Sequence, residues 1–424
     1  MITSLVKIQL IKNSKSLLLI FFAILPIICS AQLKPAKILT SNMVLQRDEP
    51  IRFWGKASPG EPLSVVFANE KRDVIIQNDS SWTVTFKKQK SNSQPQSVIF
   101  TSGDEKIELA NILIGDVWLC IGQSNMEWPM IKELHYKDEI AESNQPNLRF
   151  YNPTYAGKNM YNIPFSDSII KDLTPENFYK GQWQTSNNNS FKQMSAVGYY
   201  FGKKISTETT VPVGLINISI GGAPLEAFIN VATLKNSEQF SDKTKGDWLL
   251  NTSLPVWIRE RGKQNIGDLQ NVPHDQNGNN HAFKPGFAYE SGIEPYLNIP
   301  IKGILCYQGE SNAQEKERVN EFAALSALMM EDYRKQWKNL QLPFYYVQLS
   351  SIDTLKYKGQ LWPEFRDEQR KMLQLIPNSG MAVTSDIGFR NDVHPTNKKD
   401  VGDRLARWAL NNTYHKKRSE ERRV

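Results

Sequence analysis

The stretch IGDVWLCIGQSNM, residues 114–126, decides the fold class. Its first eight residues are largely apolar and predict a strand buried on both faces, and the glycine that follows predicts a sharp turn into a helix. Ser124 stands at that turn. A serine there presents its hydroxyl above the sheet edge, beside the unpaired backbone N–H groups that begin the helix. The stretch predicts an α/β sheet with a candidate nucleophile, although a serine that opens a helix is more often only an N-cap.

Strand-like and helix-like segments alternate through the rest of the chain. Apolar runs typical of strands occur at residues 213–220, 299–307, 344–349 and 381–384. Helical periodicity occurs at residues 126–135, 197–209, 315–337, 363–375 and 397–410. This alternation predicts a parallel sheet with helices on both faces, in which ligands bind beyond the carboxyl ends of the strands. We assign it to residues 113–411.

The preceding segment, residues 32–112, has a different pattern. Short β-rich pieces separated by turn residues occur at 51–55, 63–67, 74–77, 82–86 and 98–101. Short strands at even spacing favour a β-rich unit of the sandwich or jelly-roll-like kind. We therefore predict an N-terminal β segment followed by an α/β domain.

A polar stretch interrupts the α/β region from about residue 230 to 294. Its periodicity is weak and it is rich in Lys, Asn, Gln and Gly. Long irregular segments within compact domains are commonly functional loops. We interpret this one as an insertion over the site, with a plain solvated loop as the alternative.

Residues 1–31 have the pattern of a signal peptide. Three lysines precede an apolar run at 17–28, and small residues at 29–31 follow it. The run is shorter than the roughly 20 residues that span a bilayer. We predict cleavage after Ala31 and a secreted or periplasmic protein; an uncleaved anchor and a lipid attached to Cys29 are the alternatives.

The formal net charge of +7 comes mostly from the two ends of the chain. Residues 1–31 and the last nine residues contribute +3 each, so the body carries only +1. A near-neutral body lacks the basic surface that nucleic-acid binding requires, and we exclude that class of partner. Residues 412–424 form a tail whose end reads like a translated sequencing adapter; we interpret it as non-native, with a short basic tail as the alternative.

Two further motifs follow predicted strands and supply hydrogen-bond donors. SIGGAPLE at 219–226 contains paired glycines, which let a backbone N–H such as that of Gly222 approach a ligand closely. YQGESN at 307–312 ends in Asn312, whose neutral amide can stabilise an oxyanion. Each motif alone is equally consistent with an ordinary turn.

The last motif, DIGFRNDVHP at 386–395, supplies a candidate base. An imidazole takes a serine proton near neutral pH, and a neighbouring carboxylate fixes its tautomer. His394 has Asp392 two residues before it, and Asp386 is the reserve candidate for the acid. The motif therefore predicts a Ser-His-Asp arrangement with Ser124.

These four motifs, in this order, resemble the blocks GQSNM, GG-x-x-x-E, QGESN and DIHP of the sialate O-acetylesterase family within the SGNH hydrolases. The resemblance covers about residues 36–411. It implies a three-layer α/β/α fold with a parallel sheet and an N-terminal jelly-roll-like module. It also implies a secreted serine carbohydrate esterase that removes O-acetyl groups from sugars through an acyl-enzyme, without metal or cofactor.

The same resemblance implies roles for individual residues. Ser124 is the expected nucleophile, with Asp392 and His394 completing the triad, and the oxyanion hole is expected from the Ser124 and Gly222 amides and the Asn312 side chain. Polar side chains of the motifs are expected to bind the sugar: Gln123, Glu226, Gln308 and Glu310. Aromatic side chains near them are expected to stack on it: Trp128, Tyr307 and Trp362.

Other functions stay open at this point. Related esterases that act on acetylated xylan or other polysaccharides share these motifs, and a carbohydrate-binding protein that has lost activity is an alternative of another class. A lipase or peptidase is disfavoured because no G-x-S-x-G elbow is present. The oligomeric state and the sugar are not predicted. Cys120 and Cys306 are too few for a disulfide scaffold, and we favour buried free thiols over a bridge.

Overall fold

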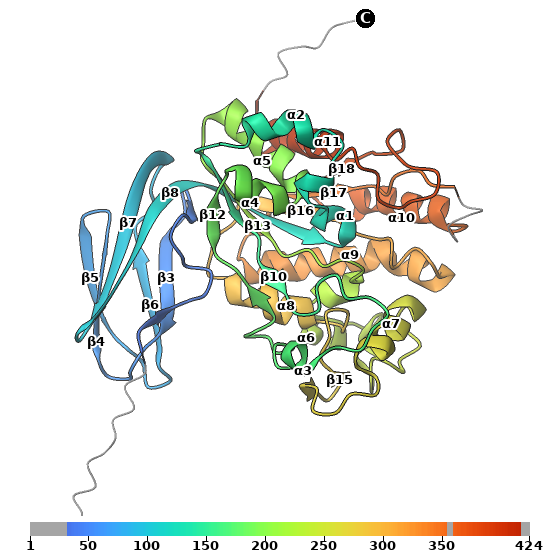
Figure 1. The fold of residues 1–424 in the computed structure, drawn as a ribbon, viewed down its shortest axis with the longest axis horizontal. Coiled ribbons are helices and arrows are strands. Elements are labelled where there is room, and N and C mark those ends of the chain that lie inside the picture. The colour runs from blue at the N-terminus through green and yellow to red at the C-terminus, as the bar shows by residue number, and fades with distance from the viewer. Residues whose placement is uncertain (1–31, 354–358, 417–424) are drawn as a thin grey trace, which may run out of the picture.

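A computed structural model describes residues 32–353 and 359–416 of the chain (Figure 1). The predicted signal peptide at 1–31 and the end of the tail at 417–424 lie outside the described residues. Among the helices that the structure describes, none combines the length and apolar character needed to cross a bilayer.

The sheet that carries the motifs is parallel over six neighbouring strands. Its order is β12-β9-β13-β8-β16-β17-β18, and only the edge strand β12 runs antiparallel to its neighbour. The bounds are β8 (Glu105–Gly122), β9 (Leu148–Tyr151), β12 (Trp183–Thr185), β13 (Val213–Asn217), β16 (Gly303–Tyr307), β17 (Phe344–Val347) and β18 (Ser379–Ala382). Because β8 lies between β13 and β16, the loops after all three strands meet at one point of the carboxyl edge.

Helices cover both faces of this sheet. Figure 1 shows α5 (Ala196–Thr209) and α11 (Lys399–Trp408) above the strands, and α9 (Lys316–Gln336) below them. A further helix, α10 (Trp362–Leu375), packs beside α9. Strands β13, β16 and β17 are buried at every residue, as expected for strands covered on both faces. The mixed α/β class predicted from the alternation is confirmed.

The N-terminal segment forms β structure around an aromatic core. Its strands are β1 (Lys34–Pro35), β2 (Val44–Gln46), β3 (Ile51–Lys56), β4 (Pro62–Phe67), β5 (Glu70–Ile75), β6 (Ser81–Phe86) and β7 (Asn92–Ser102). Four phenylalanines, one each from β3, β4, β6 and β7, meet edge to face in its core, namely Phe53, Phe67, Phe86 and Phe100. Edge-to-face pairs of this kind add to the free energy gained by burial.

One strand joins the two regions. The first part of β8 pairs with β7, and its second part pairs with β13 and β16. Exposure alternates along residues 105–111 and then ceases, because the later residues are covered on both faces. The chain therefore passes from one region to the other within a strand, where the sequence pattern had placed a boundary between residues 112 and 113.

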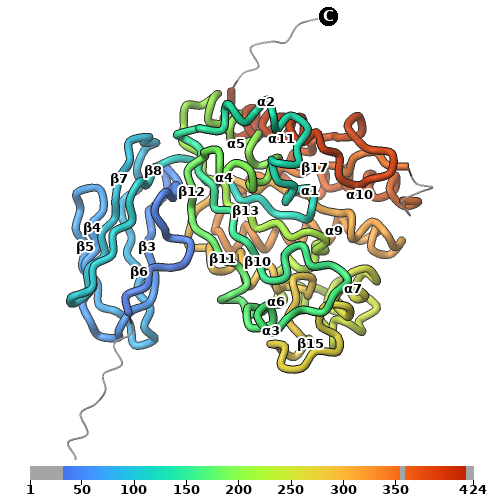
Figure 2. Tube along the Cα trace, viewed as in Figure 1, coloured from blue at the N-terminus to red at the C-terminus, as the bar shows by residue number. Residues whose placement is uncertain are grey.

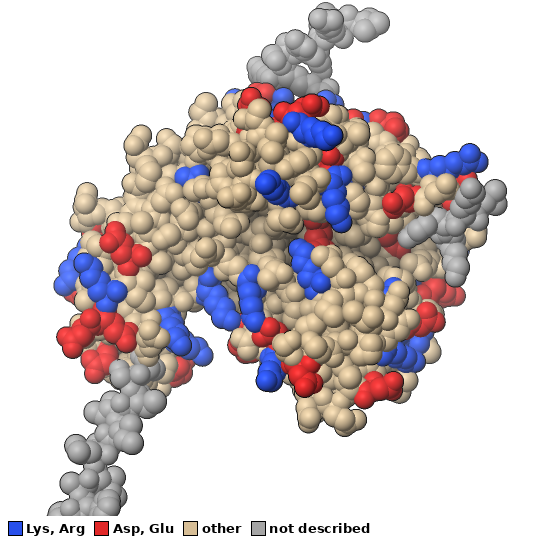
Figure 3. All heavy atoms as spheres, in the orientation of Figure 1, with Lys and Arg blue, Asp and Glu red and all other residues tan. Residues whose placement is uncertain are grey.

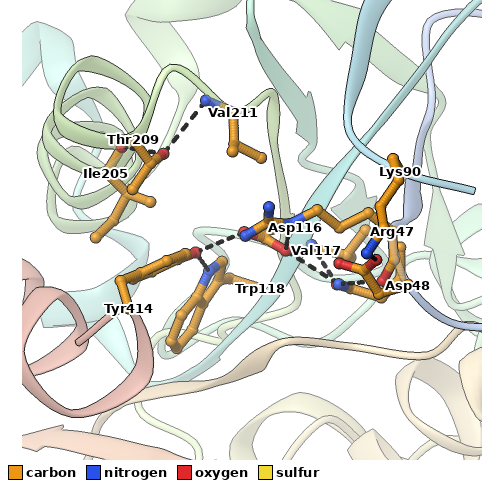
Figure 4. A network of polar contacts seen from close by, with 11 residues as sticks. Arg47, Asp48, Lys90, Asp116, Val117, Trp118, Ile205, Thr209, Val211 and Tyr414 are labelled. Atoms are coloured by element: carbon orange, nitrogen blue, oxygen red, sulfur yellow. Dashed lines mark hydrogen bonds and ion pairs between the residues drawn. The ribbon is translucent and has the colours of Figure 1, made fainter. Parts of the chain in front are cut away.

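A buried carboxylate fixes this junction (Figure 4). Asp116 is fully buried, and its oxygens accept hydrogen bonds from the Arg47 guanidinium at 2.9 and 3.0 Å. Tyr414, near the other end of the described chain, donates its hydroxyl to the same carboxylate at 2.9 Å. Figure 4 shows Arg47 and Tyr414 reaching Asp116 from opposite sides. The first residues of the predicted tail are thus part of the fold, since η6 (Ala409–Thr413) and Tyr414 pack on the domain.

The structure differs from the sequence prediction in two respects. Residues 126–135 do not form one helix: α1 (Ser124–Glu127) ends before Pro129, and α2 (Tyr136–Glu139) begins after a turn. Proline accounts for the break, since it lacks the N–H that a continuing helix would use. Strands β9 and β12 were not predicted at all.

The segment at 230–294 is built around buried side chains, so the solvated-loop interpretation is wrong. It contains α6 (Val231–Lys235), α7 (Val256–Ile266) and α8 (Phe287–Gly292). Trp248 and Phe283 are among its buried aromatic residues. In the trace of Figure 2 the segment, coloured yellow-green to gold, forms the lower end of the molecule, below the sheet.

Charged side chains form no continuous basic surface on the face seen in Figure 3. Lys and Arg atoms lie singly or in small groups among Asp and Glu atoms. This distribution agrees with the near-neutral charge of the chain body.

Candidate active site

Three of the predicted residues form a hydrogen-bonded chain at the carboxyl edge of the sheet. Ser124 begins α1 directly after β8, and its Oγ lies 2.8 Å from Nε2 of His394. The other ring nitrogen of His394, Nδ1, lies 2.8 Å from Oδ1 of Asp392, which also accepts from the His394 backbone N–H at 2.9 Å. A serine, an imidazole and a carboxylate in this order can activate the hydroxyl as a nucleophile.

The reserve acid, Asp386, is held elsewhere. Its two oxygens accept from both terminal nitrogens of the Arg404 guanidinium at 2.6 Å each. This bidentate contact lowers the pKa of Asp386 to about 2. The geometry therefore brings Asp392, and not Asp386, to His394.

The environment of His394 favours a neutral imidazole. Burial lowers the pKa of His394 from its ordinary value of 6.5, and the hydrogen bond to Asp392 opposes that shift. One face of the ring stacks on Trp128, with centroids 5.3 Å apart and planes 20° from parallel. A neutral, oriented imidazole is the form that accepts a proton from serine.

Two backbone N–H groups just after β8 and β13 have no hydrogen-bond acceptor in the part of the chain that the structure describes. Among the described residues, the amides of Ser124 and Gly222 donate no hydrogen bond. Gly222 has φ +81°, a conformation that favours glycine, and a Cβ there would lie 3.0 Å from the Phe283 ring. Two free amides at adjoining strand ends are suited to hold an oxyanion.

Glu127 fixes the turn that presents Gly222. Its Oε2 accepts the backbone N–H of Gly221 at 2.6 Å, and its carboxylate also accepts the Tyr155 hydroxyl at 3.1 Å. Lys158 pairs with the same carboxylate at 2.9 Å. Glu127 lies three residues after Ser124, so one short helix connects the nucleophile to the glycine turn.

Asn312 is more enclosed than expected. It is fully buried, its Nδ2 donates to Glu226 at 2.9 Å, and its Oδ1 accepts the Leu225 N–H at 3.1 Å. Only the second N–H of this amide is left for an oxyanion.

Glu226 does not face the substrate, which corrects the sequence prediction. It is 0% exposed, and its Oε1 lies 3.2 Å from Nζ of Lys243, itself buried. Lys243 also contacts Glu321 at 2.5 Å. A buried carboxylate needs such partners because an isolated buried charge is costly. Glu226 therefore anchors the 230–294 segment to the sheet.

The other three candidates for sugar contacts are buried as well. Gln123 is 3% exposed, Gln308 is 2% exposed and Glu310 is 5% exposed. Gln123 Oε1 accepts from Gln308 Nε2 and from the Ser311 N–H, each at 3.2 Å. These side chains connect the loops beneath Ser124, so the prediction that they bind sugar hydroxyls does not fit their burial. Tyr307 and Trp362 are equally buried, which leaves Trp128 as the aromatic candidate beside the triad.

A buried polar network beneath the triad escaped the sequence analysis. Asn125 donates to a carboxylate oxygen of Glu310 and accepts from Nζ of Lys398. Lys398 is fully buried, and its Nζ lies over the Trp128 ring at 5.6 Å from the centroid. Burial lowers the pKa of Lys398 to about 7 and raises the pKa of Glu310 to about 7. The position of Lys398, four residues after His394, is the one feature of the sequence that could have indicated this network.

The two cysteines lie in neighbouring strands and are both free and buried. This confirms the interpretation as buried thiols.

Comparison with known proteins gives one consistent result. The sequence pattern of the family described as "Carbohydrate esterase, sialic acid-specific acetylesterase" matches residues 284–411. Sialate O-acetylesterases from Pongo abelii and Homo sapiens are 27% and 25% identical to the chain, over 87% of its length and 69% of theirs. A carbohydrate acetylesterase structure from Xanthomonas citri is 28% identical, covers 90% of this chain and 75% of its own, and has a TM-score of 0.71. In sequence and in fold, the chain is therefore similar to the sialic acid-specific acetylesterase family of carbohydrate esterases.

Proposed function

We propose that the protein is a serine esterase that hydrolyses O-acetyl groups on sugar hydroxyls, with O-acetylated sialic acid as its substrate. The observation that carries the proposal is the chain of contacts from Ser124 through His394 to Asp392, at 2.8 Å each. Its fold is of the SGNH type, with a jelly-roll-like N-terminal unit.

The geometry supports a double displacement. Ser124 Oγ attacks the acetyl carbonyl while His394 Nε2 takes its proton, and Asp392 stabilises the imidazolium. The carbonyl oxygen, now negative, is held by the N–H groups of Ser124 and Gly222, with Asn312 as a third donor. His394 then protonates the departing sugar oxygen, leaving acetyl-Ser124, and a water activated by His394 releases acetate.

Trp128 and the glycine turn form the walls of the proposed acyl site. Trp128 lies against His394 and Gly222 lies beside Phe283. We expect strong preference for acetyl over acyl chains of about eight carbons, because side chains close to the nucleophile set such limits.

Acetate release from defined sugars tests the proposal. Purified protein is given 9-O-acetylated sialic acid and acetylated xylo-oligosaccharides in parallel. The proposal expects a higher kcat/KM on the sialate. A roughly tenfold advantage for the xylan fragment, or about 1.4 kcal/mol of transition-state preference, would reject the sialate while keeping the esterase. Absence of acetate from both would reject the esterase.

Export from the cytoplasm is part of the proposal. The pattern of lysines, apolar run and small residues in 1–31 supports a cleaved signal peptide. N-terminal sequencing of the exported protein should begin at Gln32, and a lipid on Cys29 would contradict it.

A further inference from the structure

Lys398, the residue before α11, is a fully buried cation. In the part of the chain that the structure describes, no carboxylate lies within 4.0 Å of its Nζ, which donates its hydrogen bond to Oδ1 of Asn125. The ammonium also lies over the rings of Tyr307 and Trp128, at 5.3 and 5.6 Å from their centroids. Burying a charge without a counter-ion is costly, so the position of this lysine requires an explanation.

Two other buried lysines show what a structural role looks like in this chain. Nζ of Lys243 lies 3.2 Å from a carboxylate oxygen of Glu226. Nζ of Lys284 lies 2.6 Å from a carboxylate oxygen of Asp275. Each of these lysines therefore has a direct counter-ion among the described residues. Lys398 has none there, so the same explanation does not account for its burial.

Lys398 reaches the triad along two paths. Because an ammonium group only donates, it can face only the oxygen of the Asn125 amide. The amide nitrogen is thereby left to donate to the carbonyl oxygen of Val393, the residue before His394. On the second path the ammonium lies against Trp128, the ring on which the His394 imidazole stacks. The first path positions His394, and the second brings a positive charge near it.

The charged groups around His394 give the direction of the electrostatic effect. Burial lowers the pKa of His394, and the contact with Asp392 opposes that shift. The positive charges of Lys398 and Lys132 lower this pKa further. A cation near the imidazole disfavours its protonated form, so loss of the Lys398 charge raises the pKa of the base.

Lys398 carries its charge over the pH range in which His394 titrates. Burial lowers the pKa of Lys398 to about 7, and three carboxylates oppose that shift, namely Glu310, Asp392 and Glu133. The ammonium is therefore charged below pH 6.5, where His394 takes up its proton. Burial raises the pKa of Glu310 to about 7, so at acidic pH this carboxyl group does not cancel the ammonium charge.

We propose that Lys398 is a positioning residue of the esterase, whose buried ammonium orients Asn125 and keeps the His394 imidazole neutral until Ser124 gives up its proton. Asp392 stabilises the imidazolium during the reaction, and Lys398 opposes the protonation that this carboxylate would otherwise favour before substrate binds. The inference rests on the proposed esterase activity and adds to it a residue outside the triad.

The pH dependence of kcat/KM on 4-nitrophenyl acetate tests this role, because it reports the free enzyme. Lys398→Met removes both the charge and the donor. Its acid limb should move to higher pH by about 0.5 to 1 unit. Its kcat on the plateau should fall about 10- to 100-fold, with KM within about threefold of wild type. Lys398→Gln lacks the charge but keeps an N–H donor for Asn125, so its limb should move as far while more of kcat is retained.

Lys132→Met is the matched control. Nζ of Lys132 also lies 5.6 Å from the Trp128 centroid, but this lysine is exposed. Water and salt screen an exposed charge. Lys132→Met should therefore move the limb less than half as far as Lys398→Met and leave the plateau kcat within about threefold. Titration of the His394 imidazole by NMR gives the same comparison without relying on turnover, and circular dichroism checks the fold of each variant.

The outcomes separate the positioning role from the activity. A folded Lys398→Met enzyme that keeps the wild-type limb or the wild-type plateau kcat overturns the inference and leaves the esterase intact. A limb that moves equally in Lys132→Met overturns it too, because burial of the charge would then be irrelevant. If the wild type hydrolyses no acetyl ester, the proposed function fails, while the NMR titration still decides whether Lys398 controls the protonation of His394.

Discussion

Asn125 donates a 2.8 Å hydrogen bond from its side-chain nitrogen to the carbonyl oxygen of Val393. The bond joins the residue after the candidate nucleophile to the residue before the candidate base. It is buried, and its orientation is fixed because the same amide contacts Glu310 and Lys398. The separation of Ser124 from His394 is therefore set by a side chain outside the triad.

Asn125→Ala should lower kcat on a chromogenic acetate ester far more than it changes KM. Displacement of a catalytic group by about 1 Å can reduce the rate about 100-fold. Asn236→Ala, at an exposed position, is the control. An Asn125→Ala enzyme with wild-type kcat, confirmed folded by circular dichroism, would show that the bond does not position His394.

Asp392→Asn and Asp386→Asn should have unequal effects. Loss of the triad acid has reduced kcat by about 10⁴-fold in a serine protease, and we expect a strong loss at Asp392. Asp386 pairs with Arg404 on the surface and does not contact His394, so its substitution should leave kcat within about threefold. The variant should also stay folded, because surface changes usually alter the free energy of unfolding by about 0.5 kcal/mol or less. Steady-state rates on the same ester rank the two. The reverse ranking would transfer the acid role to Asp386.

The acid limb of kcat/KM should lie below pH 6.5. Activity requires neutral His394, and burial lowers its pKa from that value, so the base stays neutral into mildly acidic solution. Asp392→Asn removes an influence that raises this pKa, so the limb of the variant should move to still lower pH. A wild-type limb above 6.5 would contradict the buried environment of the imidazole.

Glu127→Ala should reduce kcat by about 10- to 100-fold, because the Gly221 amide would lose a charge-assisted acceptor and the turn carrying Gly222 would lose its position. Glu127→Gln retains an acceptor oxygen and should recover part of the rate. Both are compared in kcat and KM on the chromogenic ester. Equal kcat values for Glu127→Ala and the wild type would show that Glu127 does not position the oxyanion turn.

Asp116→Ala should lower the free energy of unfolding by about 3–5 kcal/mol, since it leaves Arg47 without its partner at a buried junction. Tyr414→Phe removes one hydroxyl hydrogen bond to the same carboxylate and should cost about 1 kcal/mol. Urea unfolding measures both, and kcat of the folded variants should be unchanged. An Asp116→Ala variant with the wild-type free energy of unfolding would mean that the junction is held by apolar packing alone.

The sequence predicted the α/β alternation and the residues that meet at the sheet edge, because strand-end motifs of a parallel sheet converge on the same edge. It could not decide between two acids near His394, since the choice depends on Arg404, a residue of the following helix that pairs with Asp386. The sequence also could not show burial: Glu226 has the polarity of a sugar-binding residue, but it is buried against Lys243 of the 230–294 segment. Strand β9 was missed because Arg149 interrupts its apolar run.

Hydrolysis of 4-nitrophenyl acetate by Ser124→Ala tests the central claim most directly. With the 2.8 Å contact to His394 removed and the fold unchanged, the account predicts a loss of kcat of at least about 10³-fold relative to wild type. A Ser124→Ala enzyme that retains a rate within about tenfold of wild type would contradict the assignment of Ser124 as the nucleophile.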